Sequence, residues 1–422
     1  MSLKGNILTN YVGAGVVTIS PILALPWYLS LLGVKQFGLL SFIATLQVVL
    51  TLIDAGMSQS LVREFTLRLD NEKGSKLKAA ALLFGFERIY WLFALLIGGL
   101  TMLLANFVAT HWLNLGGLAI ELGVLAVYGA AILFMVQFPG SVYRSVLVAG
   151  QAYVELNGVL VTSALFRHIG GVVVLLFWPS IAAYIIWHAL IALIDTLFRA
   201  KLAWNFLAVK RNQIGWKINE LRPTWSLIAS MTSATWLGAL TVQMDKIVLS
   251  KMVSIEQFGY YVIAATLATG VLQLVYPLVQ AVLPRAIQLR QQTIKLHNLN
   301  IKLLKSISLV AGLVLIGYIF FGKVVLAFWL KNLLVVDAVF PLLSVLLLGT
   351  FLNAFYNIGY INWIVHEKIK RIFQVNLISL ILSIILVPVF VIHYGTVGAA
   401  FSWLIINLIG LILSLEWVKY KK

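Results

Sequence analysis

Long apolar segments separated by short polar ones follow one another through the whole sequence. Each is long enough to cross a hydrocarbon layer of about 30 Å as a helix. Their boundaries are least distinct between the fourth and fifth segments. The pattern predicts twelve membrane-spanning helices, at residues 7–32, 37–61, 79–108, 118–138, 157–178, 181–198, 224–253, 258–283, 301–321, 338–365, 372–393 and 396–418.

Part of the second segment recurs later in the chain. Gln36-Phe37-Gly38, Ala44-Thr45-Leu46 and Gln59 reappear 221 residues on, which gives seven identities over 24 positions. The offset is close to half of the 422 residues, and the later apolar segments fall in phase with it. We therefore expect two related halves within one chain.

Composition supports a membrane protein. Hydrophobic residues make up 61% of the chain, charged residues 11%, and the mean hydropathy is +0.99, which is more apolar surface than a soluble domain can bury. The sequence contains no cysteine, so disulfides, thiolate metal sites and cysteine nucleophiles are excluded. The first segment has full length and no small-residue cleavage site after it, so we expect an uncleaved anchor.

The positions of the basic residues predict the orientation. Of the 31 Lys and Arg residues, 24 fall in the segments that alternate to one side, and only Lys35, Lys251, Lys323 and Lys331 fall on the other. This is the positive-inside pattern, which predicts that both termini are cytoplasmic. The net charge of +17 then reflects topology and attraction to anionic lipid, and does not indicate nucleic acid.

These patterns together predict an all-α polytopic membrane protein. Its twelve helices would form two six-helix bundles, residues 1–208 and 224–422, joined by a cytoplasmic linker at 209–223. Because six helices return the chain to its starting side, the bundles would be related by a pseudo-two-fold axis along the membrane normal, with a binding cleft between them. We expect a short amphipathic segment within 285–305, and no outward loop longer than the one at 322–337.

Two arginines are predicted to lie deep in the membrane. Counted along their helices, Arg88 and Arg167 are about 14 and 15 Å from the ends of their spans. A buried charge costs several kcal/mol unless it faces a partner or a wet cavity. One reading is a cavity with a cationic wall, and the alternative is that these arginines pair with Glu87 or Asp195 to fasten helices together.

The second half carries neutral polar residues in its spans. Asn353 and Asn357 share one face of a helix, near two tyrosines. A cationic wall facing amides suits an anionic head with hydroxyls, such as a pyrophosphate-linked sugar, because the guanidinium fork matches phosphate oxygens. For His168 and the asparagines, hydrogen bonding between helices is the alternative. Asp245 and the following lysine are expected to form a solvated interfacial pair.

The candidate site contains no catalytic residue and no metal ligands. Phosphate loops, metal-spaced histidines and nucleophile elbows are missing from the sequence, so we predict that the protein is not an enzyme and has no cofactor beyond H⁺ or Na⁺ coupling. The ion-coupling candidates are Asp54, Glu87 and Asp195. The substrate-binding candidates are Arg88, Arg144, Arg167, Arg199, Asn353 and Asn357.

Several short motifs are spread over nearly the full chain. They are Leu32-Gly33, Gln36-Phe37-Gly38, Asp54-Ala55-Gly56, Arg63, Pro139, Tyr143-Arg144, Gly150, Asn157, Asp245 and Gly259-Tyr260. These motifs resemble those of Wzx-type O-antigen flippases, which belong to the MATE-like multidrug/oligosaccharidyl-lipid/polysaccharide (MOP) superfamily. That family typically has Tyr-Gly where this chain has Phe37-Gly38.

The resemblance implies an alternating-access transporter built of two six-helix bundles in a V shape. Its substrate would be an undecaprenyl-pyrophosphate-linked oligosaccharide, an O-antigen or related repeat unit, moved from the cytoplasmic to the periplasmic leaflet of a bacterial inner membrane. The implied partners are this lipid-linked oligosaccharide and membrane lipids, with polysaccharide polymerase and chain-length proteins as candidates, and no nucleic acid.

Other classes of membrane protein remain as alternatives. A MATE-type exporter of cationic drugs would need acids facing its cavity, without arginines beside them. A lipid II flippase would carry basic residues in its first helix and two more helices. A glycan ligase or polymerase would need a substantial periplasmic loop, and a structural subunit is a further alternative.

Overall fold

The computed structural model describes residues 3–54, 56–69, 75–211, 214 and 222–421. The chain forms two compact units, Met1–Ala239 and Leu240–Lys422, and the boundary falls within α9 (Arg222–Met252). Most of the predicted linker at 209–223 lies outside the described residues, and so does Ala55 of the Asp54-Ala55-Gly56 motif.

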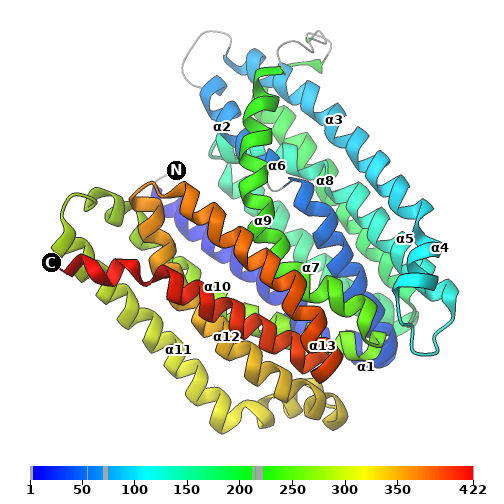
Figure 1. Cartoon of the computed structure of the whole chain (residues 1–422). Coiled ribbons are helices and arrows are strands. Elements are labelled where there is room, and N and C mark those ends of the chain that lie inside the picture. The colour runs from blue at the N-terminus through cyan, green and yellow to red at the C-terminus, as the bar shows by residue number, and fades with distance from the viewer. Residues whose placement is uncertain (1–2, 55, 70–74, 212–213, 215–221, 422) are drawn as a thin grey trace. The chain divides into compact units, whose positions relative to one another are not determined.

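The first unit is a bundle of long helices connected by short ones (Figure 1). In this bundle α1 packs against α5 and α7, and α7 packs against α8. Together with the first part of α9, its elements are α1 (Leu3–Thr51), η1 (Leu52–Asp54), α2 (Met57–Leu69), α3 (Ser75–Leu103), α4 (Ala105–Phe107), η2 (Val108–Trp112), α5 (Ile120–Gln137), α6 (Gly140–Ala149), α7 (Tyr153–Phe177) and α8 (Ile181–Leu207).

Two predicted spans lie in α1 and are separated by a kink. Gly33 has φ 76° and ψ 164°, a conformation that a residue without a Cβ adopts at little cost. The second of these spans was predicted to continue to residue 61, which is wrong. The helix ends at Thr51, a single turn covers Leu52–Asp54, and a new helix, α2, starts at Met57.

The second unit contains α10 (Ile255–Gln288), α11 (Thr293–Leu330), α12 (Leu333–Val365), α13 (Ile369–Ser414) and η5 (Leu415–Lys421). A kink at Gly395, with φ 57°, divides α13 where two spans were predicted. The amphipathic segment expected within 285–305 stays a prediction, and in this region α10 and α11 leave only a short turn between them. The expected loop at 322–337 is likewise mostly helical.

Small residues allow the helices of the second unit to approach closely. A Cβ on Gly349 would lie 2.5 Å from the Trp403 ring, and one on Gly359 would lie 2.4 Å from Ser414 Cβ. Both glycines are on α12 and both neighbours are on α13. Such close packing is the usual way in which helices associate in lipid, where water does not drive them together.

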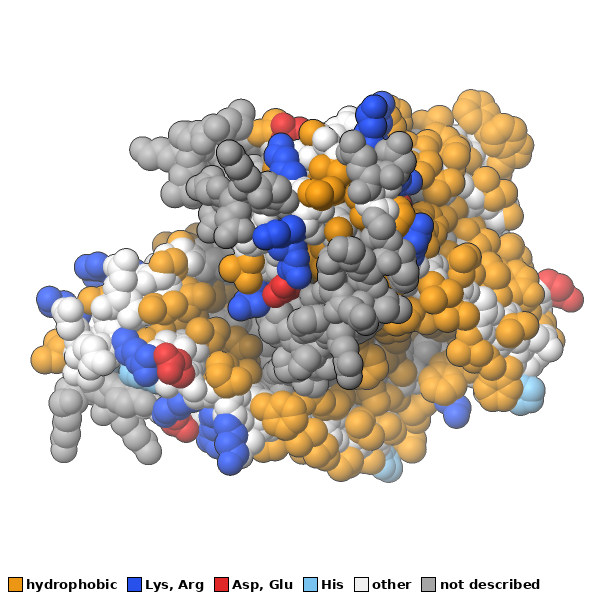
Figure 2. Space-filling model, turned by 90° about the horizontal axis from the view of Figure 1, so that it is seen from above, with side chains coloured by type: hydrophobic (Ala, Val, Ile, Leu, Met, Phe, Trp, Pro, Cys, Tyr) orange, Lys and Arg blue, Asp and Glu red, His pale blue; other side chains and the backbone are white. Residues whose placement is uncertain are grey.

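Among the described residues, nine helices are long and apolar enough to cross a membrane. Each of α1 and α13 contains two of the predicted spans, and much of α9 lacks described side chains, so the count of twelve stays a prediction. Large hydrophobic side chains are exposed along these helices, for example Phe328 at 82% and Leu103 at 83%. On the face in Figure 2, Lys and Arg side chains gather beside broad hydrophobic areas. The chain is a multi-pass membrane protein.

Candidate functional site

A buried ion pair lies within α8. Asp195 and Arg199 are one helical turn apart, only 3% and 7% exposed, and Arg199 Nη2 donates to Asp195 Oδ2. Arg199 Nη1 also donates to the Gly140 carbonyl at 3.2 Å, and Ser163 Oγ of α7 donates to Asp195 Oδ1 at 3.2 Å. A Cβ at Gly140 would lie 2.7 Å from Arg199 Nη2, so glycine makes room for the guanidinium there.

A second arginine, Arg167, approaches the same carboxylate from α7. It interacts electrostatically with Asp195 and Arg199 and with two tyrosines. Among the described residues it forms no ion pair, and its buried Nε has no hydrogen-bond partner. Because Arg199 already occupies the nearby carboxylate, the charge of Arg167 is left without a dedicated counterion.

Asp54 lies at the end of η1 and is held by two hydroxyl donors. Ser58 Oγ donates to Oδ2 at 2.6 Å, and Tyr90 of α3 donates to Oδ1 at 2.6 Å. Arg144 of α6 interacts electrostatically with Asp54 and with Arg199, the partner of Asp195. It therefore links Asp54 to the buried ion pair of α8. We call Asp54, Arg144, Arg167, Asp195 and Arg199 the charge cluster, and its three arginines outnumber its two aspartates.

Next to Arg167 lies a group of four aromatic side chains, of which the sequence pointed only to His168. It consists of Tyr28 of α1, His168 of α7, and Tyr184 and His188 of α8, and we call it the Tyr–His cluster. The Tyr28 hydroxyl lies 3.3 Å from His168 Nδ1 and 3.4 Å from His188 Nε2, and the Tyr184 and His188 rings stack at 3.8 Å. The helical spacing of Tyr184 and His188 in an apolar segment was the available signal.

The Tyr–His cluster confirms that His168 bonds between helices. The Tyr28 hydroxyl also donates to the His168 carbonyl at 3.2 Å. Gly171, one turn further along α7, permits this approach, since a Cβ there would lie 2.9 Å from Tyr28 Oη. The cluster therefore fixes α1, α7 and α8 next to Arg167.

Arg88 lies elsewhere. Its side chain is exposed, and its guanidinium lies 3.9 Å from the centre of the Phe84 ring on α3. A role of Arg88 in substrate binding stays a prediction. Glu87 accepts hydrogen bonds from Trp204 Nε1 at 3.0 Å and from Arg211 Nη2 at 2.7 Å.

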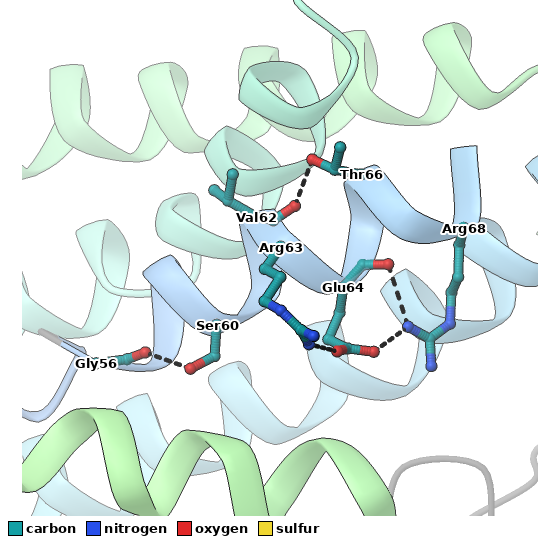
Figure 3. Close-up of polar contacts among 7 residues, drawn as sticks. All are labelled: Gly56, Ser60, Val62, Arg63, Glu64, Thr66 and Arg68. Carbon is teal, nitrogen blue, oxygen red and sulfur yellow. Dashed lines mark hydrogen bonds and ion pairs between the residues drawn. The ribbon is translucent and has the colours of Figure 1, made fainter. Parts of the chain in front are cut away.

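The first basic segment is helical as far as Leu69. Within α2, Glu64 lies between two arginines, 2.8 Å from Arg63 Nη1 and 2.5 Å from Arg68 Nη1 (Figure 3). The Arg63 side chain is 57% exposed. Solvated ion pairs of this kind contribute roughly 0–1 kcal/mol, so Arg63 serves as a reference for an arginine outside the charge cluster.

In the second unit, the two candidate asparagines join a hydrogen-bonded set. Asn353 Nδ2 donates to Asn407 Oδ1 of α13 at 2.7 Å, and Asn357 Nδ2 donates to the Asn353 carbonyl at 2.8 Å. Asn407 in turn donates to the Trp403 carbonyl at 2.8 Å. Asn353 thus fastens α12 to α13, and a role of either asparagine in substrate binding stays a prediction.

The expected solvated pair in the second unit is wrong. Asp245 is only 8% exposed and accepts a hydrogen bond from the Tyr261 hydroxyl at 2.6 Å, while Lys246 Nζ lies 3.7 Å from its carboxylate. The helix turns Asp245 toward α10 and not toward solvent. In the searched part of the chain, no three His, Asp or Glu side chains are grouped so that they could hold a metal ion.

Comparisons with known proteins agree with this architecture. No family model matches the chain. Over 420 residues it is 21% identical to a Shigella flexneri protein named "Putative O-antigen transporter", and the match covers 99% of this chain and 98% of that protein.

The solved structure of the lipid II flippase MurJ in an inward closed conformation aligns with a TM-score of 0.78 at 15% identity, over 98% of this chain and 87% of that one. An inward-facing multidrug resistance MATE family transporter of the MOP superfamily aligns with a TM-score of 0.64 at 13% identity, over 96% of this chain and 95% of that one. The fold is therefore that of MOP-superfamily transporters, and the resemblance to O-antigen transporters predicted from the motifs is confirmed.

Proposed function

We propose that this protein is a flippase that moves an undecaprenyl-pyrophosphate-linked oligosaccharide from the cytoplasmic to the periplasmic leaflet of a bacterial inner membrane. It does so by alternating access of two six-helix bundles with twelve spans and cytoplasmic termini. The sugar head crosses within the protein, while the polyprenyl tail stays in lipid.

The observation that carries this proposal is the excess of arginine in the charge cluster. Asp195 already pairs with Arg199, so the Arg167 guanidinium is left with an unused donor. A pyrophosphate offers paired anionic oxygens, which a planar guanidinium fork can bind with two hydrogen bonds. In this proposal Arg167 and Arg144 contact the pyrophosphate, and Arg199 is a positioning residue fixed by Asp195.

The relatives favour a lipid-linked substrate. The sequence relative, which matches along nearly its full length, is named as an O-antigen transporter. The structural neighbour with a TM-score of 0.78 is named as a lipid II flippase. Both names point to a polar head carried on a lipid. A cationic drug would be repelled by three arginines, so the MATE-type activity is the less favoured alternative.

The membrane potential can supply the driving force. An interior-negative potential moves an anion outward with about 2.3 kcal/mol per charge per 100 mV. Export of a pyrophosphate head needs no coupling ion for this reason. The Asp54 carboxylate accepts two hydrogen bonds from hydroxyl groups, and the Asp195 carboxylate accepts one and pairs with Arg199. These contacts fit a structural role for both acids better than ion binding.

The test is a flipping assay in proteoliposomes with a fluorescent undecaprenyl-pyrophosphate oligosaccharide. Arg167→Gln is expected to slow flipping about 10- to 100-fold, the equivalent of losing one charged hydrogen bond of about 1.5–3 kcal/mol, and Arg167→Lys to recover part of the rate. Arg63→Gln is the matched control and should flip at the wild-type rate.

Two results would overturn the proposal. Wild-type flipping by Arg167→Gln would remove the arginine from substrate binding. Efflux of cationic drugs by a protein that does not flip the labelled lipid would instead establish a drug exporter. Size-exclusion profiles of each variant in detergent identify any that fail to fold.

A further inference from the structure

A cavity of about 500 Å³ lies within the second unit. Its volume is in the range of small-molecule sites, about 300–1,000 Å³. It lies between α11, the last turns of α12, and the end of α13 with η5. Residues that define it include His297, Ile301, Leu304, Phe355, Leu411 and Trp417.

The cavity has an elongated apolar wall. His297, Ile301, Leu304 and Ser308 recur at helical spacing along one face of α11, and together they extend over about 16 Å. Beyond Ser308 the helix exposes large hydrophobic side chains, such as Leu309 at 64%. A flexible hydrocarbon chain that enters from surrounding lipid fits such a wall.

Basic side chains gather at the end of the cavity where η5 begins. Glu416, which directly precedes Trp417, accepts from Lys368 Nζ at 3.0 Å and lies 3.4 Å from Arg371 Nη2. Two cations therefore share one carboxylate. These two basic side chains outnumber the carboxylate between them, so they leave net positive charge at this end of the cavity.

Polar groups inside the cavity are placed at the same end. His297 Nδ1 is buried and has no hydrogen-bond partner in the described part of the chain. Its ring lies 5.8 Å from that of Trp417, and tryptophan is typical of the depth at which lipid headgroups meet hydrocarbon. The cavity is thus apolar along its length and polar and cationic at one end.

We propose that this cavity binds one anionic phospholipid, with an acyl chain along the α11 wall and the phosphate group beside Lys368 and Arg371. The positive charge favours an anionic headgroup over a zwitterionic one, and the apolar wall suits the acyl chain of a membrane lipid. This site is independent of the proposed transport activity.

Native mass spectrometry of the purified full-length protein tests the proposal, with phosphatidylglycerol and phosphatidylcholine of identical chains as probes. Phosphatidylglycerol is expected to bind about fivefold or more tightly than phosphatidylcholine, the effect of about one basic side chain near an anionic headgroup. Ser308→Trp fills the cavity and should weaken phosphatidylglycerol binding about tenfold. Ser306→Trp, on another face of the same helix, should leave binding unchanged.

The charge is tested separately. Arg371→Gln should reduce the preference for phosphatidylglycerol, whereas Lys323→Gln near the far end of α11 should not. Equal binding of the two lipids, or unchanged binding by Ser308→Trp, would overturn the proposal. Retention of a fatty acid or a polyprenyl phosphate, without phosphatidylglycerol, would overturn it as well.

Discussion

Replacing Asp195 by asparagine removes the carboxylate that neutralises a buried guanidinium. Asp195 is 3% exposed and Arg199 is 7% exposed, so water cannot compensate the charge that remains. Breaking a buried ion pair by removing one partner costs about 3–5 kcal/mol. We expect Asp195→Asn to lower the free energy of unfolding by that amount, and the nearby Arg167 to place it in the upper part of the range.

A double-mutant cycle measures this interaction. Asp195→Asn, Arg199→Gln and the double variant are unfolded in mixed detergent micelles and followed by tryptophan fluorescence. The double variant should be less destabilised than the sum of the single variants by about 2 kcal/mol, because it leaves no unpaired charge. The exposed pair of Arg290 and Glu367, with side chains 41% and 72% exposed, is the control and should give a coupling of about 0–1 kcal/mol. Additive effects at Asp195 and Arg199 would refute the reasoning.

Two further substitutions test helix packing in the two units. Asn353→Ala removes the bond to Asn407 and should cost about 0.6–1.7 kcal/mol in the same unfolding assay, whereas Asn357→Ala, which loses only a bond within its own helix, should cost less. Gly171→Ala crowds the Tyr–His cluster and should cost about 1–3 kcal/mol, while Gly158→Ala on the same helix, with nothing within 4 Å of the added Cβ, should not destabilise. Equal costs for the two asparagine variants would contradict the bond between α12 and α13. Equal costs for the two glycine variants would contradict the close approach at Gly171.

The sequence predicted the helices well because apolar length alone determines what can cross a membrane. It could not predict how consecutive spans join. Gly33 and Gly395 each kink a continuous helix without a loop, so two predicted spans fall within α1 and two within α13. The sequence did not predict the end of α1 at Thr51, because the apolar pattern continues through the residues that interrupt the helix.

Depth along a helix could be counted from the sequence, but orientation around it could not. Arg88 and Arg167 are at similar depths by residue count, yet Arg88 is exposed beside Phe84 and Arg167 approaches Asp195. Some partners of these charges come from other helices, at sequence separations that no local pattern predicts. The Tyr90 hydroxyl that holds Asp54 is 36 residues away in the chain.

The acids within the spans argue for a substrate-driven cycle in the proposed flippase. Asp54 and Asp245 each accept a tyrosine hydroxyl at 2.6 Å, and Asp195 is held by Arg199 and a serine. An ion that bound any of these carboxylates would have to displace a buried hydrogen bond, at a cost of about 1–3 kcal/mol. Arg167 already has an unused donor, so an incoming pyrophosphate would gain a bond there without breaking one. The charge of the cargo itself is therefore the simplest trigger for closure around it.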